Sequence, residues 1–254
     1  MSSDLKNSQQ FQVGEQLIID IEARSGSIDI RNGALGRAIV SVDSPDDWQI
    51  IQLGDSISIR AAGRRARAVR MLVEVPAGTD VEVKSVSADL TLAGAYGATR
   101  LHTVSGNVRV DSAARLDLNS VSGDVRATSV TGDASLTTVS GDVDVREVGG
   151  RLTASSSSGD IRVLRAGDDV TVGTTSGDVR CECATGSSIG VKSISGDVNI
   201  GLPAGIRVEP DISTLSGRTT LPAPSGSAPV SAPRVVRVRL RTVSGNINID
   251  RVIA

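Results

Sequence analysis

The sequence predicts an all-β protein, a single-stranded parallel β-helix with coils of about 18 residues. Three observations predict this fold. A Ser-Gly-Asp or Ser-Gly-Asn motif recurs at a nearly fixed period, short strands of alternating apolar and polar residues surround each copy, and only 1% of the residues are aromatic. A globular core relies on large aromatic side chains, whereas a core of Val, Ile, Leu, Ala and Thr suits thin stacked layers of equal width.

The repeat sets the length of one coil. The motif serine, or its equivalent in Ser-Ala-Asp, falls at positions 87, 105, 122, 140, 158, 176, 195, 216 and 244. Successive copies are therefore 18, 17, 18, 18, 18, 19, 21 and 28 residues apart. Weaker turn signals such as Thr131-Gly132-Asp133 lie midway between copies, so the unit is about nine residues, one strand and one turn, used twice per coil. Such a period is typical of a solenoid, in which each coil buries its apolar face against its neighbours.

The strands show a period of two. VDV at 143–145 and IRV at 161–163 follow the motif, and this alternation indicates one buried face. A second set of apolar residues lies four positions before the motif serine: Leu101, Leu118, Leu136, Val172, Val191 and Leu240. Glycine about every nine residues argues against long helices. We expect successive coils to lie ~4.8 Å apart, as hydrogen-bonded strands do.

Composition divides the chain into five parts. We expect a disordered tail at 1–10, irregular opening coils or an N-terminal cap at 11–80, regular coils at 81–220, a Pro/Ser-rich loop insertion at 221–233 and the final coil at 234–254. Terminal repeats are typically irregular, and the insertion accounts for the 28-residue gap. Because the final coil ends in INIDRVIA with no polar tail beyond it, we expect an uncovered coil there, with unpaired strand edges that another segment covers or a second molecule stacks on.

The repeated [ST]-V-S-G-[DN]-V-x-V pattern, the opening FQVGEQLIIDIEARSGSIDI and the segment VEVPAGTDVEVKSVSADL carry a family resemblance. Over residues 11–254 the chain resembles the putative-adhesin family of bacterial β-strand-repeat domains of unknown function. The resemblance implies a single-stranded, right-handed β-helix. It implies no catalytic residues and no cofactor.

The recurring aspartate has two readings, one concerning shape and one concerning chemistry. As part of a turn, Asp accepts hydrogen bonds from backbone N–H groups, and Asn at 107 and 246 does the same without charge. The alternative is a calcium-binding β-roll, in which a ladder of carboxylates holds the ion; its candidate ligands are Asp124, Asp142, Asp160, Asp178 and Asp197. Calcium takes six to eight oxygen ligands, while most of these turns contain one acidic residue, so the sequence favours the structural reading.

Other candidate sites are sparse. His102, the only histidine, takes an outward strand position, and a β-helical enzyme acting on acidic glycans is disfavoured because no aromatic platform or carboxylate cluster is evident. Two arginine-rich stretches break the repeat pattern and are candidate contacts for an acidic partner. They contain Arg64, Arg65 and Arg67, and Arg237, Arg239 and Arg241.

The sequence thus predicts a non-enzymatic β-helix scaffold or protein-interaction module, self-associating end to end or binding an unknown protein partner. A calcium-binding β-roll and a bactofilin-like cytoplasmic polymer are the alternatives. The net charge of −2 and the lack of stacking aromatics argue against nucleic acid. The sequence contains no transmembrane segment and no apolar secretory signal at its start, so a cytoplasmic location is expected.

Overall fold

The computed structural model describes residues 8–14, 16–62, 68–221 and 235–252. They form β-strands and one 3₁₀ turn, η1 (Pro45–Asp47), so the predicted all-β fold is confirmed. The chain folds into two compact units, unit 1 (residues 1–127) and unit 2 (residues 128–254), and strand β9 (Val125–Val130) spans their boundary. Among the described residues, no helix has the length and apolar character that crossing a membrane requires.

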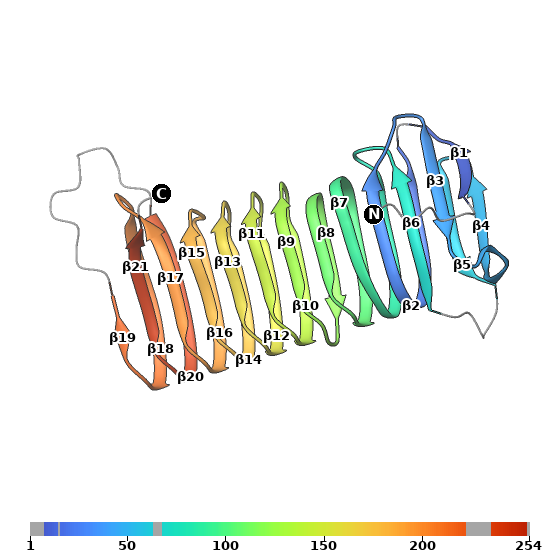
Figure 1. Ribbon diagram of the computed structural model, residues 1–254. Helices are drawn as coiled ribbons and strands as arrows, with labels where there is room; N and C mark the ends of the chain where they lie inside the picture. The colour runs from blue at the N-terminus through green and yellow to red at the C-terminus, as the bar shows by residue number, and fades with distance from the viewer. Residues whose placement is uncertain (1–7, 15, 63–67, 222–234, 253–254) are drawn as a thin grey trace. The chain divides into compact units, whose positions relative to one another are not determined.

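Unit 2 is a stack of two-stranded coils (Figure 1). In each coil the first strand ends at the motif serine, and the second strand follows the glycine corner. The first strands are β10 (Ala134–Ser140), β12 (Leu152–Ser158), β14 (Val170–Ser176) and β16 (Ser188–Ser195). The second strands are β11 (Val143–Val148), β13 (Ile161–Ala166), β15 (Val179–Ala184) and β17 (Val198–Pro203).

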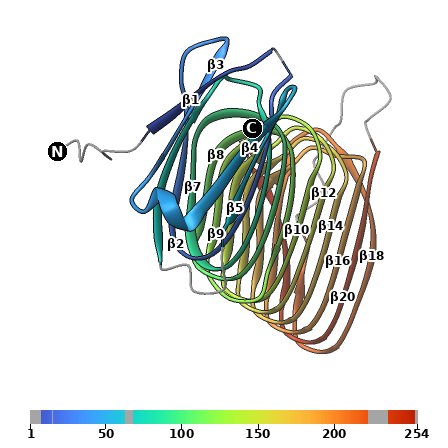
Figure 2. The same cartoon turned by 90° about the vertical axis from the view of Figure 1, so that its right-hand side faces the viewer.

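Each strand of unit 2 pairs in parallel with its equivalent in the next coil. One sheet runs β10-β12-β14-β16 and the other β11-β13-β15-β17. Leu136 pairs with Ala154, which pairs with Val172, so the register advances by one coil of 18 residues. The nine-residue unit used twice per coil is therefore confirmed. Figure 2 looks along the coils, with the first strands following one another along the same wall.

The C-terminal segment of unit 2 is interleaved with the coil that precedes it. It comprises β20 (Val235–Ser244) and β21 (Ile247–Val252), and the preceding coil comprises β18 (Arg207–Ser216) and β19 (Thr219–Thr220). Strand β20 pairs with β16 on one side and β18 on the other, and β21 pairs likewise with β17 and β19. The final coil along the chain is therefore the second-to-last coil in space.

This arrangement corrects the expectation that the C-terminal coil is uncovered. Among the described residues at this end of unit 2, the strands without a second neighbour are β18 and β19 of the preceding coil. Pro210 in β18 has no N–H for a sheet ladder, and proline within sheets is confined to edge strands. By contrast, Val236, Val238 and Leu240 of β20 are all fully buried, as an interior coil requires.

Unit 1 contains the opening coils. Strand β2 (Ile18–Asn32) forms one coil, and β7 (Asp80–Ser105) and β8 (Val108–Ser120) continue the parallel stack. On its other side β2 pairs in parallel with β5 (Ser56–Ala61) and β6 (Val69–Val75).

Antiparallel strands complete the opening region of unit 1. They are β4 (Trp48–Leu53) on β5, β3 (Arg37–Val42) on β6, and β1 (Ser8–Gln12) on β3. The predicted disordered tail thus includes residues 8–10, which form part of β1, and residues 1–7, which lie outside the described residues. The predicted insertion at 221–233 likewise falls outside them, apart from Leu221.

The core is an aliphatic ladder, as predicted from the period of two. Leu101 and Leu118 in unit 1, and Leu136, Val172, Val191 and Leu240 in unit 2, are at most 2% exposed. Each such side chain packs on its equivalents in the neighbouring coils, so burial is repeated once per coil. Burying one aliphatic side chain contributes roughly 1.5–3 kcal/mol, and the repeat distributes this stabilisation evenly along each unit.

Two glycines four residues apart provide a test of the corner geometry. Gly177, at a corner, has φ of 134°, and a Cβ there would collide with the carbonyl oxygen of Gly159 in the preceding coil. Gly173, in the middle of β14, has no atom within 4 Å of a built Cβ. We expect Gly177→Ala to lower the free energy of unfolding by about 2 kcal/mol, and Gly173→Ala to leave it unchanged or raise it. Urea unfolding of both variants measures this, and equal stabilities would contradict the corner assignment.

Candidate functional site

The motif Asp and Asn side chains form a ladder of hydrogen bonds, here called the corner ladder. In unit 2 the Oδ1 atom at one corner accepts the backbone N–H of the equivalent residue in the next coil. The donor and acceptor pairs are Asp160 to Asp142 (2.9 Å), Asp178 to Asp160 (3.0 Å), Asp197 to Asp178 (2.8 Å), Asn246 to Asp197 (2.7 Å) and Arg218 to Asn246 (3.0 Å). Unit 1 has the same bonds from Asn107 to Asp89 (2.8 Å) and from Asp124 to Asn107 (3.1 Å).

The corner ladder shows what the repeated carboxylate does structurally. Each oxygen satisfies a backbone donor that the tight corner leaves outside the strand pairing, and it does so in the next coil. The turn interpretation from the sequence placed this bond within one corner, whereas the structure places it between coils. Asn107 and Asn246 make the same bond as the aspartates, so charge is not required for it.

The ladder of unit 2 ends at Arg218. The backbone N–H of Arg218 donates to Asn246, but its side chain takes the place of the next Asp or Asn and has no acceptor oxygen. At the other corners, an Asp or Asn oxygen accepts the backbone N–H of the next coil. A further coil added beyond β18 and β19 would meet the Arg218 guanidinium at that place, which cannot accept a hydrogen bond. Together with Pro210, this makes β18 a protected edge of the kind that limits further strand pairing.

The calcium candidates occupy the corner ladder. Asp142, Asp160, Asp178 and Asp197 lie at successive corners of unit 2, and Asp124 lies at a corner of unit 1. One oxygen of Asp142, Asp160, Asp178 and Asp197 already accepts a backbone N–H, and Asp160 also contacts Arg162 at 3.2 Å. Among the residues that the structure describes, no three His, Cys, Asp or Glu side chains gather in a way that could hold a metal ion. Calcium binding remains a prediction.

Buried hydroxyls also hold some of the corners, and the sequence reasoning missed this role. The first residue of most motif copies is a buried Ser or Thr, and at Thr103, Ser120, Thr138 and Thr242 its hydroxyl donates to the carbonyl of the residue two positions on. Examples are Thr103 to Ser105 (3.0 Å) and Thr242 to Ser244 (3.2 Å). The buried hydroxyls of Ser156, Thr174 and Ser193, at the same place in their coils, have no hydrogen-bond partner among the described residues. The signal was present, because every copy of the motif begins with Ser or Thr.

The arginines of β20 that the sequence marked as candidate partner contacts lie next to β18, because β20 is inserted between β16 and β18. Arg237, Arg239 and Arg241 point outward beside β18, where Arg239 pairs with Asp211 at 3.1 Å and Arg237 with Glu209 at 3.9 Å. Arg241 lies 4.0 Å from Asp211. Their side chains are 58–83% exposed, so each pair contributes at most about 1 kcal/mol. Arg64, Arg65 and Arg67 lie outside the described residues.

A groove of about 1050 Å³ runs beside these arginines on the outer face of β12, β14, β16, β20 and β18. We call it the glycine groove, because Gly173 and Gly190 take outward positions in its floor. Across the sheet, Gly173 is in register with Lys192, and Gly190 is in register with Arg239. Sequence reasoning missed it, although glycine in the middle of an alternating strand, outside the corner motif, is an unusual signal.

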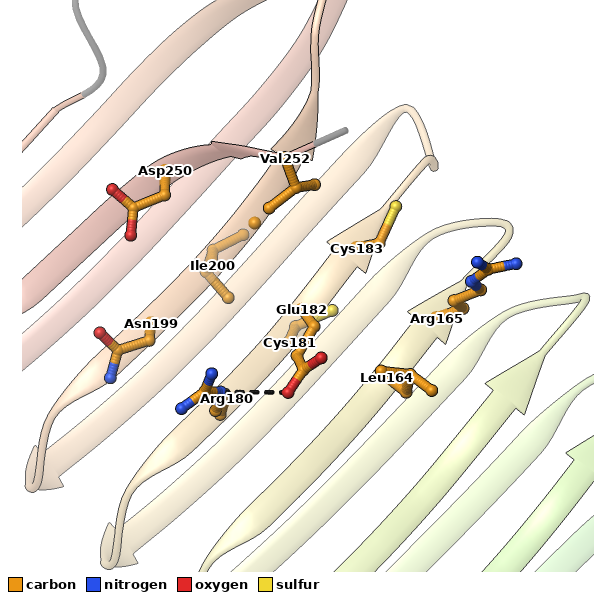
Figure 3. Close-up of a pocket in the computed structure, with 11 residues that line it drawn as sticks. Leu164, Arg165, Arg180, Cys181, Glu182, Cys183, Asn199, Ile200, Asp250 and Val252 are labelled. Atoms are coloured by element: carbon orange, nitrogen blue, oxygen red, sulfur yellow. Dashed lines mark ion pairs between the residues drawn. The ribbon is translucent and has the colours of Figure 1, made fainter. Parts of the chain in front are cut away.

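A second hollow of about 540 Å³ lies on the outer face of β13, β15, β17 and β21. Figure 3 shows Arg180 and Glu182, neighbours on one face of β15, paired at 3.3 Å, and Cys183 near the end of the same strand. Cys181 and Cys183 are both free thiols. Cys181 points into the core, and burial raises the pKa of its thiol to about 12, so it stays protonated at neutral pH.

The two parallel sheets and the corner ladder define a β-solenoid with two strands per coil. The chain belongs to the Toastrack DUF4097 family, whose model matches residues 40–250. The resemblance to a family of putative adhesins of unknown function is thereby confirmed. No curated protein matches the chain.

Solved structures resemble the chain over nearly its whole length. A putative adhesin from Bacteroides fragilis is 13% identical, with 97% of this chain and 96% of that chain covered and a TM-score of 0.44. A putative lipid binding protein from Parabacteroides distasonis is 10% identical, with 97% and 96% covered and a TM-score of 0.43. A putative adhesin from Parabacteroides merdae is 11% identical, with 97% and 95% covered and a TM-score of 0.42. Similarity this distant assigns no activity.

The corner ladder predicts different effects for two substitutions at one position. Asp178→Asn keeps the acceptor for the N–H of Asp197, so we expect the free energy of unfolding to change little. Asp178→Ala leaves that donor without its partner, and we expect a loss of about 1 kcal/mol. Urea unfolding at neutral pH compares the two. Equal losses for Asn and Ala would show that the carboxylate charge matters, rather than the acceptor.

The same ladder gives an expectation for calcium. Because one oxygen of each described ladder carboxylate in unit 2 accepts an N–H, we expect millimolar calcium to leave the melting temperature unchanged relative to chelator. Differential scanning calorimetry in the two buffers measures this. A rise with calcium that is lost in Asp160→Asn would establish the calcium-binding alternative.

Proposed function

We propose that this protein is a non-enzymatic binding scaffold and that the glycine groove is its binding site. The observation that carries the proposal is the groove itself, a hollow on an otherwise regular outer sheet face with two glycines in its floor and cations beside them. Core and corner side chains hold one coil on the next and repeat from coil to coil. The outward positions are not constrained in this way, so each coil can contribute a different side chain to binding.

The chemistry of the groove supports binding over catalysis. Its two carboxylates, Glu209 and Asp211, are both paired with arginines. Its hydroxyls belong to Ser and Thr side chains, and the single histidine of the chain, His102, belongs to unit 1 and is not among the residues that line the groove. Activation of a hydroxyl nucleophile needs a base held against it by a third group.

Self-association is the competing form of scaffold function. End-to-end stacking and a bactofilin-like polymer both need a coil edge that accepts another coil, and in unit 2 that edge is the coil of β18 and β19. Pro210 and Arg218 disfavour further pairing at this edge. We therefore expect no concentration-dependent assembly in sedimentation velocity runs, and filaments at high concentration would favour the polymer. The predicted cytoplasmic location is part of the proposal and is tested by cell fractionation.

A photo-crosslinking amino acid tests the proposed binding site. Placed at Thr171 in the groove, we expect it to give a discrete adduct in extract of the source organism, and the adduct should disappear when Gly190→Val fills the floor. The matched control is the same crosslinker at Arg162, which is exposed on the outer face of the other sheet of unit 2. Adducts of equal yield at both positions, or adducts that survive Gly190→Val, would contradict the groove as the binding site.

A further inference from the structure

The two glycines of the groove are not explained by the backbone. Corner glycines such as Gly159 have φ of 131° and lie against the carbonyl of the preceding coil, so a side chain is excluded there. Gly173 and Gly190 are not among the residues with positive φ, and no atom lies within 4 Å of a Cβ on Gly173. On Gly190 the nearest atom would be the carbonyl oxygen of Val170, at 3.9 Å.

Glycine within a strand is destabilising, and it often marks a place where a ligand or another backbone approaches closely. The backbone conformation and the packing do not require these two glycines. We therefore infer that their effect is to keep the floor of the groove free of side chains. Thr171 precedes Gly173 by two residues on the same face and is in register with Gly190. The floor is thus two open positions bordered by a hydroxyl.

The groove has an excess of positive charge. Lys192, Arg207, Arg237 and Arg239 line it together with only two carboxylates, Glu209 and Asp211. Among the described residues, Lys192 and Arg207 have no ion-pair partner. The pairs that Arg237 and Arg239 make are exposed and weak, so an incoming carboxylate can replace Glu209 or Asp211 at little cost. An anionic ligand is therefore the complement of this site.

The spacing of the charges indicates the shape of that ligand. Arg237 and Arg239 are two residues apart on β20, so they recur at roughly 6.6 Å along the strand. Alternate side chains of an extended peptide recur at the same distance. A strand-like segment lying along β20 thus meets one cation with every second side chain, and hydroxyls such as that of Thr171 can bond to its backbone.

Other anionic polymers fit less well. Phe11, Trp48 and Tyr96 are the only aromatic residues of the chain, and all three belong to unit 1. Unit 2 therefore has no aromatic surface for the stacking of bases or sugar rings. Arginine, by contrast, binds carboxylates through two parallel hydrogen bonds, and this needs no aromatic neighbour.

We propose that the glycine groove binds an extended acidic segment of a partner protein, in which Asp or Glu occupies every second position. This inference rests on the proposed function, because it names the ligand class of the same groove. It goes further by specifying the charge and the conformation of the ligand. Lys192, Arg237 and Arg239 would bind its carboxylates, and Gly173 and Gly190 would let its backbone approach the sheet closely.

Fluorescence anisotropy with a labelled decapeptide of alternating Glu and Thr tests the proposal at low ionic strength. We expect saturable binding that weakens about tenfold in Lys192→Glu and that is lost in Gly173→Val and Gly190→Val. Because a Cβ fits at both glycines, these variants should melt at or above the wild-type temperature, which separates loss of the site from loss of the fold. A decapeptide with the same composition but all Glu residues in one block should bind more weakly.

Controls separate the ligand class from the site itself. Arg162→Glu, on the outer face of the other sheet, should leave peptide binding unchanged. If polygalacturonate or single-stranded DNA binds with the same dependence on Gly190 while the alternating peptide does not, the acidic-peptide inference is wrong and the groove stands as a binding site. If every polyanion binds equally and the glycine variants have no effect, attraction is nonspecific and the inference falls. If none of the probes binds, the groove proposal falls with it.

Discussion

The hydrogen bond from the backbone N–H at one corner to the Asp or Asn oxygen of the neighbouring coil is the contact on which each unit depends. Parallel strand pairing alone would hold the straight parts of two coils together, but at the corner the chain leaves the sheet and its donors need another acceptor. The corner ladder supplies one at each described corner of unit 2 from Asp142 to Asn246. It also fixes the register, because a slip by one residue would place a different side chain at the corner and turn the apolar face outward.

The regular coils could be predicted from the sequence because each requirement of the fold has its own residue type. The period of the motif predicted the length of one coil, and the alternation around Val143 and Val145 predicted which face of the strand is buried. Asn in place of Asp at 107 and 246 indicated that this side chain acts as a hydrogen-bond acceptor. The antiparallel strands of the opening region were not predicted. Their strands alternate in the same way as parallel ones, and no local pattern distinguishes the two kinds of pairing.

The candidate site was only partly accessible from the sequence. Arg237, Arg239 and Arg241 were recognised as a charged strand face, but their partners Glu209 and Asp211 are 28 residues away in the chain and become neighbours only through interleaving. The glycine groove depends on register across several strands. Gly173 is in register with Lys192, 19 residues further on, and the motif spacing already contains this 19-residue coil. The rest of the groove is formed by β20 and β18, which reach this place only through interleaving.

The interleaved C-terminal coil has a consequence for how the chain reaches its native state. During synthesis β18 leaves the ribosome before β20, and it carries the same Ser-Gly corner that could pair directly with β16. In the native structure β20, not β18, pairs with β16. The coil of β18, although it is synthesised earlier, can therefore pair natively only after β20 has been made. Domains usually fold from the N-terminus as they are made, but the last two coils here exchange that order. A nascent chain halted before residue 235 would therefore display a β16 edge, open to the wrong strand.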